Sequence, residues 1–504
     1  MGLLRNLPLF VLMMGVASVM MLIPATHALA LDLHRTAQPF FYSALLFGIL
    51  TALIGLATYG KRKGNVARGH LLTLIAAFAG LPLMLAVPMR EAIGNISFFD
   101  VYFEMVSSLT TTGASLIEPP SRVVSPIHLW RALVGWMGGY LILLAAIAVL
   151  APLNLGGYEV LRPVSRSSSA DKLMGSGDPT ERILRFNRDL FPLYLTATMA
   201  LWGLLVLSGA APFLSLCLAM STLATSGITP SGGLNPWQVS IWAEMLIFMF
   251  LFLAISRQIF TNEAGLPFVQ RLRQDREVRL TVLIVSLLPL ALFLRHWVGA
   301  LDDLGEGDVM TALRAFWGGL FTVLSFLTTT GFASHDWEAA RAWSGLPTPG
   351  LVLAGLAIVG GGAATTAGGV RLLRVYALYK HGTREMGRLV HPSSIGSAGA
   401  LGRNVRREGA FIAWIFFMLF GISIAAVILA LTATGLEFEA ATSFAIAALS
   451  TTGPLVDISL TGEDAVGYAA LTGAAKSVLI AAMVVGRLET LAIIALFNPD
   501  FWRS

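Results

Sequence analysis

Thr329-Thr330-Gly331 is one of four similar triplets that recur along this chain, each between a shorter, mostly apolar segment and a long apolar one. The other three are Thr111-Thr112-Gly113, Thr225-Ser226-Gly227 and Thr451-Thr452-Gly453. Neighbouring triplets are roughly 110 residues apart, and such regular spacing indicates repeated structural units. The pattern predicts one chain that carries four pore loops and closes a single ring of carbonyl oxygens around an ion.

The composition identifies the lipid bilayer as the solvent of most of the chain. Hydrophobic residues make up 56% of the sequence and charged residues only 12%, whereas about 25% charged residues is usual for soluble proteins. The single cysteine, Cys217, excludes a disulfide within the chain and a multi-cysteine metal site. The net charge of +5 lies mostly in loops between predicted spans, so membrane topology explains it without a nucleic-acid partner.

Apolar stretches of about 20 residues divide the chain into an initial pair of spans and four units of similar plan. Each unit has a span, a short apolar segment, a Thr/Ser-Gly loop and a second span. Most short segments have too few residues to cross ~30 Å of hydrocarbon, so we expect re-entrant half-helices. The sequence predicts an all-α integral membrane protein with four pseudo-symmetric span–pore-helix–span repeats around one pore. The predicted N-terminal pair of transmembrane helices covers 1–60, and pore repeats 1 to 4 cover 70–155, 186–260, 279–380 and 408–498.

The N-terminal segment also has features of a cleaved signal peptide, namely Arg5, an apolar run and Ala28-Leu29-Ala30. Its apolar run exceeds the usual length of about 7–15 residues for a signal peptide, so we expect a retained first helix.

Charge predicts the orientation in the membrane. Basic residues collect in the linkers between units, including 159–188 and 371–407, which the positive-inside rule places in the cytoplasm together with both termini. All four Thr/Ser-Gly loops then open to the outside, beside many of the acidic residues. These acids either concentrate cations at the outer mouth or only solvate the outer loops. They include Asp100, Glu104, Glu118, Asp302, Asp336, Glu338 and Asp457.

The four triplets have the chemistry of an ion filter. Carbonyl oxygens replace the hydration shell of a monovalent cation, and glycine reaches the unusual dihedrals that point successive carbonyls inward. One glycine after a helix is usually an ordinary C-cap, but four copies on one side of the membrane favour a pore. Glycine at every key position, without a serine, favours K⁺ over Na⁺. The predicted K⁺ ligands are Thr111, Thr112, Gly113, Thr225, Ser226, Gly227, Thr329, Thr330, Gly331, Thr451, Thr452 and Gly453.

In these motifs the chain resembles the TrkH/TrkG–KtrB superfamily of bacterial potassium transporters, and its TrkH branch above all, over nearly its whole length. The motifs are Leu109-Thr110-Thr111-Thr112-Gly113-Ala114, Trp136-Met137-Gly138-Gly139, Phe326-Leu327-Thr328-Thr329-Thr330-Gly331, Gly360-Gly361-Gly362 through Gly368-Gly369, Gly486-Arg487-Leu488-Glu489 and Phe501-Trp502-Arg503. The initial pair of spans also fits TrkH rather than KtrB.

The resemblance implies potassium uptake across the bacterial inner membrane, by a channel or a symporter. It also implies a homodimer with one pore per subunit and a cytosolic nucleotide-binding regulatory subunit of the TrkA type. Ala224-Thr225-Ser226-Gly227-Ile228 departs from the strict triplet, and Pro454 follows Gly453, so we expect an asymmetric ring. We expect membrane lipid but no nucleic acid as a further partner, no enzymatic activity and no covalently bound cofactor, with K⁺ as the transported ion.

A glycine-dense stretch in the second span of the third repeat is the first candidate gate. Five glycines in ten residues should break this helix and leave backbone groups that need water or protein partners. The resemblance makes this stretch the mobile loop that obstructs the pore below the filter, although close packing of helices by small residues would also explain it. Its members are Gly360, Gly361, Gly362, Ala363, Ala364, Thr365, Thr366, Ala367, Gly368 and Gly369.

Arg487, inside the apolar run 477–497, is the second candidate gate. A cation buried in a span is costly and therefore a functional candidate. Facing the cavity it would repel passing cations, the role of the matching arginine in the family. Alternatively it extends toward the cytoplasm or pairs with Glu489. Lys476, on the same helix face, is interpreted as an interfacial anchor without an assigned role.

Three other functions compete with selective potassium transport. A sodium or unselective cation pathway fits the same scaffold. A secondary transporter of a small organic solute would need several ionisable residues inside the spans. An intramembrane enzyme would need a catalytic motif, and no His-Glu-x-x-His pair or serine nucleophile turn occurs.

Overall fold

The computed structural model describes residues 8–59, 66–147, 179–235, 237–256, 270, 272–273, 275–299, 309–345, 348–390, 407–460 and 466–488. All regular secondary structure among these residues is helical, and the rest are turns and loops; there are no β-strands among them. Eight of the helices or helix pairs are long and apolar enough to cross a membrane. The predicted all-α membrane architecture is therefore confirmed.

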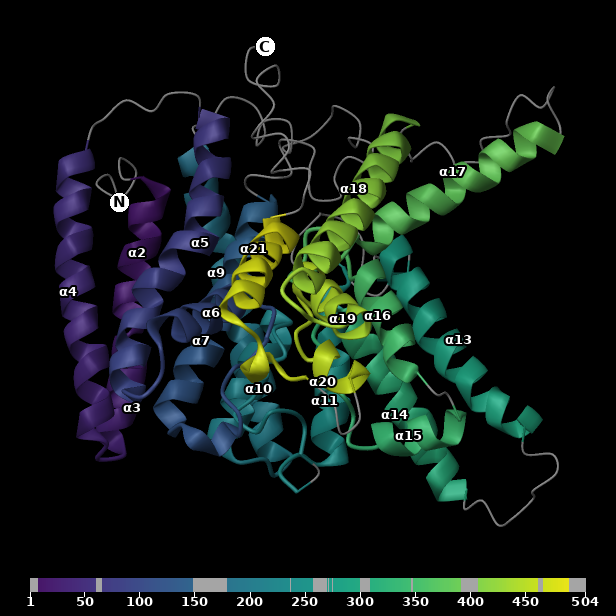
Figure 1. Cartoon of the computed structure of the whole chain (residues 1–504), viewed down its shortest axis with the longest axis horizontal. Helices are drawn as coiled ribbons and strands as arrows, with labels where there is room; N and C mark the ends of the chain where they lie inside the picture. Colours follow the sequence, from purple (N-terminus) through teal and green to yellow (C-terminus); the bar gives the residue numbers. More distant parts are fainter. Residues whose placement is uncertain are drawn as a thin grey trace.

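The N-terminal helices form a pair at one edge of the molecule (Figure 1). Helices α2 (Leu9–Met20) and α3 (Leu22–Ala30) together make one candidate span, and α4 (His34–Thr58) makes the next. α4 packs against α2 and α3 and leaves large aliphatic side chains such as Leu53 and Leu56 exposed. In a membrane protein such a face is solvated by lipid.

Four helices of 12 to 19 residues end just before the triplets, as the repeat pattern predicts, and the third of them is long and apolar enough to cross a membrane. They are α6 (Phe98–Leu109), α10 (Pro212–Ala224), α14 (Val309–Leu327) and α19 (Phe438–Leu449). The helices that precede them are α5 (Val66–Ile93), α9 (Pro179–Leu207), α13 (Arg276–Gly299) and α18 (Arg407–Thr432). The spans that follow them begin with α7 (Ser125–Ala145), α11 (Ile241–Leu251), α16 (Pro349–Val359) and α21 (Gly473–Leu488).

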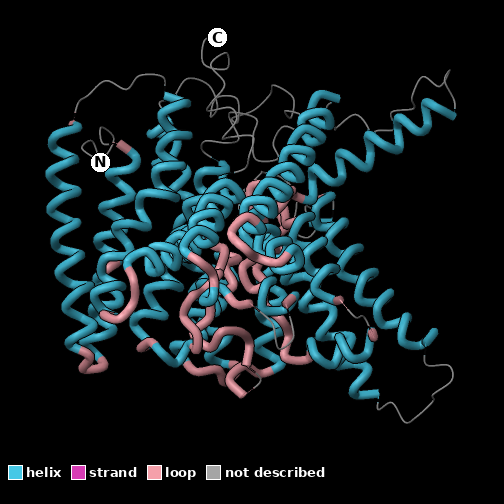
Figure 2. Tube along the Cα trace, in the orientation of Figure 1, coloured by secondary structure: helices cyan, strands magenta, loops and turns pink. Residues whose placement is uncertain are grey.

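The remaining helices are connectors or extensions of these units. They are the 3-10 turns Pro120–Arg122, Phe252–Ala254 and Tyr468–Ala470, and helices α15 (Trp337–Ser344), α17 (Leu372–Val390) and α20 (Leu455–Ser459). Figure 2 shows that many of the loops run through the middle of the molecule, surrounded by helices. Irregular backbone at membrane depth is tolerated where protein or a wet cavity satisfies it.

Several helix boundaries differ from the expected spans. The second span of repeat 2 begins at Ile241 rather than 237, because the Ser240 hydroxyl accepts a hydrogen bond from Ala243 N–H and caps the helix. The last span begins at Gly473 rather than 466, after an irregular segment, and its predicted end at 497 lies outside the described residues. α17 continues to Val390, ten residues past the expected end of its span. A helix can leave the membrane without ending, so hydropathy alone does not mark its terminus.

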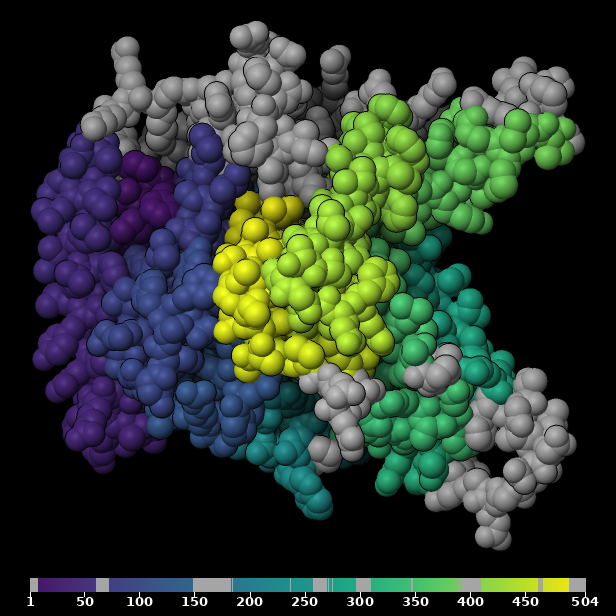
Figure 3. All heavy atoms as spheres, viewed as in Figure 1, coloured from purple at the N-terminus to yellow at the C-terminus, as the bar shows by residue number. Residues whose placement is uncertain are grey.

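The core is formed by the short helices and the helices around them. α19 packs against α21, and the two lie together on the face seen in Figure 3. Glycines permit close approach at these contacts, because a Cβ at Gly138 would overlap the Leu109 carbonyl oxygen and one at Gly486 would overlap that of Leu449. Gly138 lies on α7 and Gly486 on α21. In both repeats the following span therefore rests on the last residue of the short helix.

Candidate ion pathway

All four short helices end in the same way. In the first, Thr111 N–H donates to Ser108 O at 3.0 Å and Thr112 N–H donates to Ser107 O at 2.8 Å. This pair of bonds is the Schellman motif, in which the residue after the helix takes a left-handed backbone. The corresponding bonds from the second residue of each other triplet are Ser226 N–H to Ser221 O at 3.0 Å, Thr330 N–H to Ser325 O at 2.9 Å and Thr452 N–H to Ala447 O at 2.8 Å.

The left-handed residue at each helix end is a threonine rather than glycine. The φ angles of Thr111, Thr225, Thr329 and Thr451 are 56°, 51°, 58° and 56°. A non-glycine residue in this region costs about 1–3 kcal/mol and persists only where the surroundings impose it. Fourfold recurrence in the same register shows that the triplets share one local fold. The triplet glycines lie two residues later and are not the helix C-caps.

Loops 1, 2 and 3 are in direct contact through these glycines; loops 1 to 4 are the triplets in chain order. A Cβ on Gly113 would overlap the Ser226 carbonyl oxygen, and a Cβ on Gly227 would overlap that of Thr330. Loop 1 therefore abuts loop 2, and loop 2 abuts loop 3. The glycines are needed here for two reasons, since φ is +78° at Gly113 and +66° at Gly227.

Loop 4 closes the ring between loops 3 and 1. A Cβ on Gly331, where φ is +82°, would lie 3.0 Å from the Pro454 ring. On the other side, Gly453 N–H donates to Thr112 O at 2.6 Å. The contacts thus run from loop 1 to 2, 3, 4 and back to 1. Four segments distant in the sequence lie around one axis.

Loop 4 differs from the other three in its backbone. Gly453 is not among the glycines with positive φ, because a residue before proline is driven toward extended conformations. Its carbonyl accepts a hydrogen bond from Tyr468 Oη at 3.0 Å, and its N–H is bonded to loop 1. The ring is therefore asymmetric, as the sequence of loop 4 predicts.

Two threonine hydroxyl groups at the ends of the short helices lack hydrogen-bond partners among the described residues. Thr111 Oγ1 and Thr451 Oγ1 are buried, and neither has a hydrogen-bond partner in the described part of the chain. A buried hydroxyl without a partner is costly. A cation at this level would accept these oxygens as ligands.

The predicted break in the third repeat is confirmed. α16 ends at Val359 and α17 begins at Leu372, and the ten residues 360–369 between them are all buried. We call residues 360–371 the intramembrane loop. The bounding glycines Gly360 and Gly369 have φ of +72° and +76°.

Two hydrogen bonds hold the intramembrane loop, one to a neighbouring helix and one within the loop itself. Ala363 N–H donates to the buried Glu277 carboxylate of α13 at 2.7 Å. Arg371 Nη1 donates back to Gly362 O at 2.9 Å, from a residue whose own φ is +86°. These bonds satisfy the backbone groups that the broken helix leaves free.

The same loop lies directly against loops 3 and 4. Gly368 N–H donates to Thr329 Oγ1 at 2.7 Å. A Cβ on Gly368 would overlap the Ser450 carbonyl oxygen and crowd Thr451 Oγ1. The loop therefore packs against the ring where the short helices end.

Arg487 lies on α21 and is 2% exposed. Its three guanidinium nitrogens have no hydrogen-bond partner among the described residues. The positive charge of Arg371 is close enough to repel it. Glu489, the alternative partner, lies outside the described residues.

Comparison with known proteins supports one family. The TrkH family, described as cation transport protein, matches residues 271–504. The potassium uptake protein TrkH of Halomonas elongata is 30% identical over 88% of this chain and 86% of its own length. The chain belongs to the TrkH family. The TrkH of Vibrio parahaemolyticus is 29% identical over 86% of this chain and 84% of its own length. The crystal structure of the V. parahaemolyticus potassium transporter TrkH aligns over 100% of both chains, with a TM-score of 0.81 and 26% identity.

One acidic residue of this TrkH-family chain does not lie where the sequence placed it. Glu104 is fully buried on α6 and bonded to Arg131 at 3.0 Å, so it is not a solvated acid of an outer loop. Lys476, which had no assigned role, lies in the first turn of α21 and pairs with Asp100 at 2.6 Å, so it ties α21 to α6. The sequence does not reveal either ion pair, because the two residues of each pair are distant in the chain.

Glu244 is a buried residue of the site that the sequence analysis did not single out. It lies on α11, fully buried, and contacts residues that follow loop 3. A single carboxylate inside the apolar helix Ile241–Leu251 was the available signal, since such a residue needs a partner.

Proposed function

We propose that this chain carries K⁺ into the cell across the bacterial inner membrane, through a carbonyl-lined filter gated by the intramembrane loop. The observation that carries the proposal is the closed ring of four loops with one shared helix-end geometry. Carbonyl rings of this kind replace the hydration shell of a monovalent cation. The TrkH-family relatives, named potassium uptake proteins, give the ion.

In this proposal each part of the pathway has one task. The twelve predicted ligands, 111–113, 225–227, 329–331 and 451–453, bind dehydrated K⁺ through backbone carbonyls and threonine hydroxyls. The intramembrane loop 360–371 obstructs the inner side of the filter, and Arg487 adds an electrostatic barrier below it. Movement of this loop away from Thr329 and Ser450 opens the path.

The proposed assembly is a homodimer with one pore per subunit, bound on its cytoplasmic face by a nucleotide-binding subunit of the TrkA type. Both termini and the basic linkers lie in the cytoplasm in this arrangement, as the positive-inside rule requires. Co-purification of this chain with such a subunit, with and without nucleotide, tests the assembly.

Transport itself is tested by K⁺ uptake in a bacterium that lacks its own uptake systems, and by ion flux in liposomes under K⁺, Rb⁺ or Na⁺ gradients. We expect flux of K⁺ and Rb⁺ to exceed that of Na⁺. The different backbone at Gly453 favours one competing candidate, an unselective cation pathway. Equal flux of all three ions would establish that candidate instead.

Gly331→Ser should lower the ratio of K⁺ flux to Na⁺ flux, because the new side chain meets Pro454 and strains a backbone with φ of +82°. We expect a loss of about tenfold, equivalent to ~1.4 kcal/mol. The matched control is Gly345→Ser, which has φ of +58° but no neighbour within 4 Å of a Cβ. A normally folded Gly331→Ser protein with unchanged selectivity would contradict the filter.

A further inference from the structure

Two buried carboxylates hold the segments that leave the pore loops toward the outside. The first is Glu104, whose side chain is fully buried on α6. Its Oε1 accepts hydrogen bonds from Ser115 Oγ at 2.9 Å and from Leu116 N–H. Its Oε2 accepts from Arg131 Nε at 3.0 Å. We call Glu104 with these three donors the first clamp.

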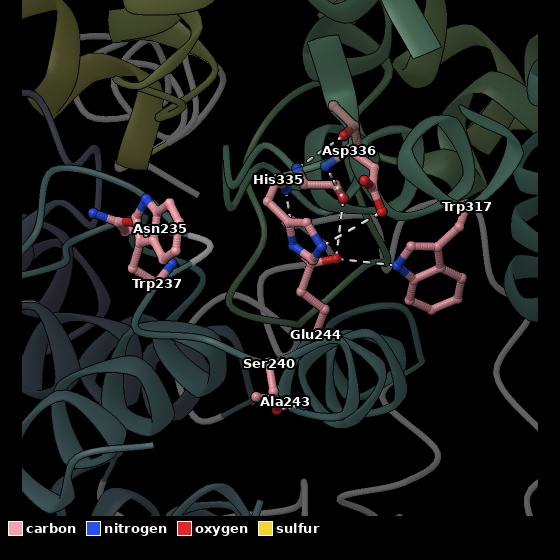
Figure 4. A network of polar contacts seen from close by, with 10 residues as sticks. Asn235, Trp237, Ser240, Ala243, Glu244, Trp317, His335 and Asp336 are labelled. Carbon is pink, nitrogen blue, oxygen red and sulfur yellow. Dashed lines mark hydrogen bonds and ion pairs between the residues drawn. The ribbon is translucent and has the colours of Figure 1, made fainter. Parts of the chain in front are cut away.

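The second carboxylate, Glu244, repeats this pattern at loop 3 (Figure 4). It accepts from Ser334 Oγ at 3.0 Å and from His335 N–H at 2.9 Å. The same side chain also accepts from Trp317 Nε1 at 3.0 Å and lies 2.6 Å from His335 Nδ1. We call Glu244 with these four contacts the second clamp.

The two clamps bind the same chemical groups at nearly the same place. Each takes a serine hydroxyl and the N–H of the residue after that serine, two to four residues beyond Gly113 or Gly331. The carboxylates themselves come from different elements. Glu104 belongs to the short helix of its own repeat, whereas Glu244 comes from α11 of the preceding repeat. The repeated contact is therefore not a by-product of one repeated sequence.

Loops 2 and 4 are held differently. Thr229, two residues after Gly227, is buried, and its hydroxyl has no hydrogen-bond partner in the described part of the chain. Loop 4 begins α20 at Pro454 and is held through Tyr468 instead. Because the loops contact one another in the order 1, 2, 3, 4, the clamped loops face each other across the ring. The clamps therefore grip one opposed pair.

Burial of a carboxylate is costly unless several donors satisfy it. A structural role inside the fold needs only that satisfaction. Here the serine and backbone donors belong to the segments that directly follow the ring-forming triplets. Hydrogen bonds to a charged acceptor are shorter and roughly twice as strong as neutral ones. Such bonds limit how far the ring can contract around a smaller ion.

We propose that Glu104 and Glu244 are positioning residues that fix the carbonyl groups of loops 1 and 3 and thereby set the preference for K⁺ over Na⁺. The proposal rests on the filter proposed above. It assigns specificity to two side chains that do not contact the ion.

The test is the ratio of K⁺ to Na⁺ flux in liposomes for Glu244→Gln and Glu104→Gln. Glutamine replaces one acceptor oxygen with an NH₂ group, which turns a donor toward the donors of the clamp. We expect the ratio to fall about tenfold with Na⁺ flux retained. Thermal unfolding of each variant is measured in parallel. A merely structural role predicts lower stability with an unchanged ratio, and that result would overturn the proposal.

Milder variants cover the case in which a glutamine variant does not fold. Ser115→Ala and Ser334→Ala each remove one donor and leave the carboxylate its others. We expect each to lower the ratio about threefold. An unchanged ratio in both folded serine variants would likewise overturn the proposal.

Two controls separate the clamps from general effects. Thr229→Val replaces the unpartnered hydroxyl of loop 2 with a methyl group and should leave the ratio unchanged. Glu338→Gln removes an exposed carboxylate whose ion pair with Arg341 spans 3.8 Å, and it should also have no effect. If Gly331→Ser changes selectivity and the clamp variants do not, the filter stands and the clamps fall. If none of them changes it, both proposals fall.

Discussion

At the residue scale, the four left-handed threonines are the most informative feature of the pathway. Each ends a short helix where glycine is the usual residue, with φ between 51° and 58°. Strain of this kind is retained where a site requires the geometry. The hydroxyls of two of these threonines, Thr111 and Thr451, have no hydrogen-bond partner among the residues that the structure describes. We interpret the strain as the cost of placing these oxygens beside the ion.

Gly138→Ala should destabilise the protein, because the added methyl group would overlap the backbone carbonyl of Leu109. Backbone cannot move aside as a flexible side chain can, so we expect a loss of about 1–3 kcal/mol. The measurement is the midpoint of thermal unfolding in detergent.

Gly203→Ala is the matched control for this change. Gly203 also lies within a helix but has no neighbour within 4 Å of a Cβ. Alanine there should leave stability unchanged or raise it by up to about 1 kcal/mol. Equal midpoints for the two variants would show that the contact at Leu109 is relaxed.

At the scale of elements, the broken span of repeat 3 is the feature that we propose as the gate. α16 and α17 are separated by the intramembrane loop, which Glu277 of α13 anchors, Arg371 braces from within, and Gly368 joins to loop 3. The glycine-dense sequence predicts the break, because glycine weakens a helix at every position. It does not predict the anchor on α13, which lies more than 80 residues away in the chain.

Arg487→Ala should raise cation flux, because it removes a buried positive charge that has no hydrogen-bond partner among the described residues. We expect an increase of several-fold rather than free passage, since in the proposed mechanism the intramembrane loop still obstructs the pore. Each kcal/mol removed from the barrier corresponds to about fivefold in rate. Rb⁺ uptake into liposomes measures the effect.

Arg487→Lys is the informative companion, because it keeps the charge and changes the shape of the group. The lysine variant should behave more like the unmodified protein than the alanine variant does. Equal increases in both would show that bulk rather than charge forms the barrier.

At the scale of the whole molecule, the acids predicted at the outer face should create a potential that depends on pH. Burial and, as the smaller cause, the negative charge of Glu118 together raise the pKa of the Asp457 carboxyl to about 6. Asp457 as a whole residue is exposed, although protein closely surrounds its carboxyl group. The carboxylate is charged above this pKa and neutral below it.

K⁺ influx should therefore fall as external pH drops from 7 to 5. The negative charge of Asp457 attracts cations above pH ~6, and its protonation removes that attraction. At both pH values, Asp457→Asn should show the low influx that the unmodified protein shows at pH 5. Its influx should therefore depend little on pH in this window. Flux at controlled external pH and low ionic strength measures the effect.

Glu118→Gln and added salt serve as controls for this prediction. Removal of the neighbouring charge should shift the midpoint to lower pH, and high salt should weaken the dependence by screening. A midpoint that stays in place in Glu118→Gln would assign the titration to another group.

From its sequence alone this chain was determined to be an all-helical membrane protein with four related pore loops and a broken span. These properties follow from apolar length, glycine content and repeat spacing, which are local in the chain. Three features became visible only in the three-dimensional contacts. The loops contact one another in a ring, the backbone of loop 4 differs from that of the others, and Glu104 and Glu244 hold loops 1 and 3. Each of these contacts joins residues distant in sequence, and the pairing of a buried charge leaves no local pattern from which its partner can be read.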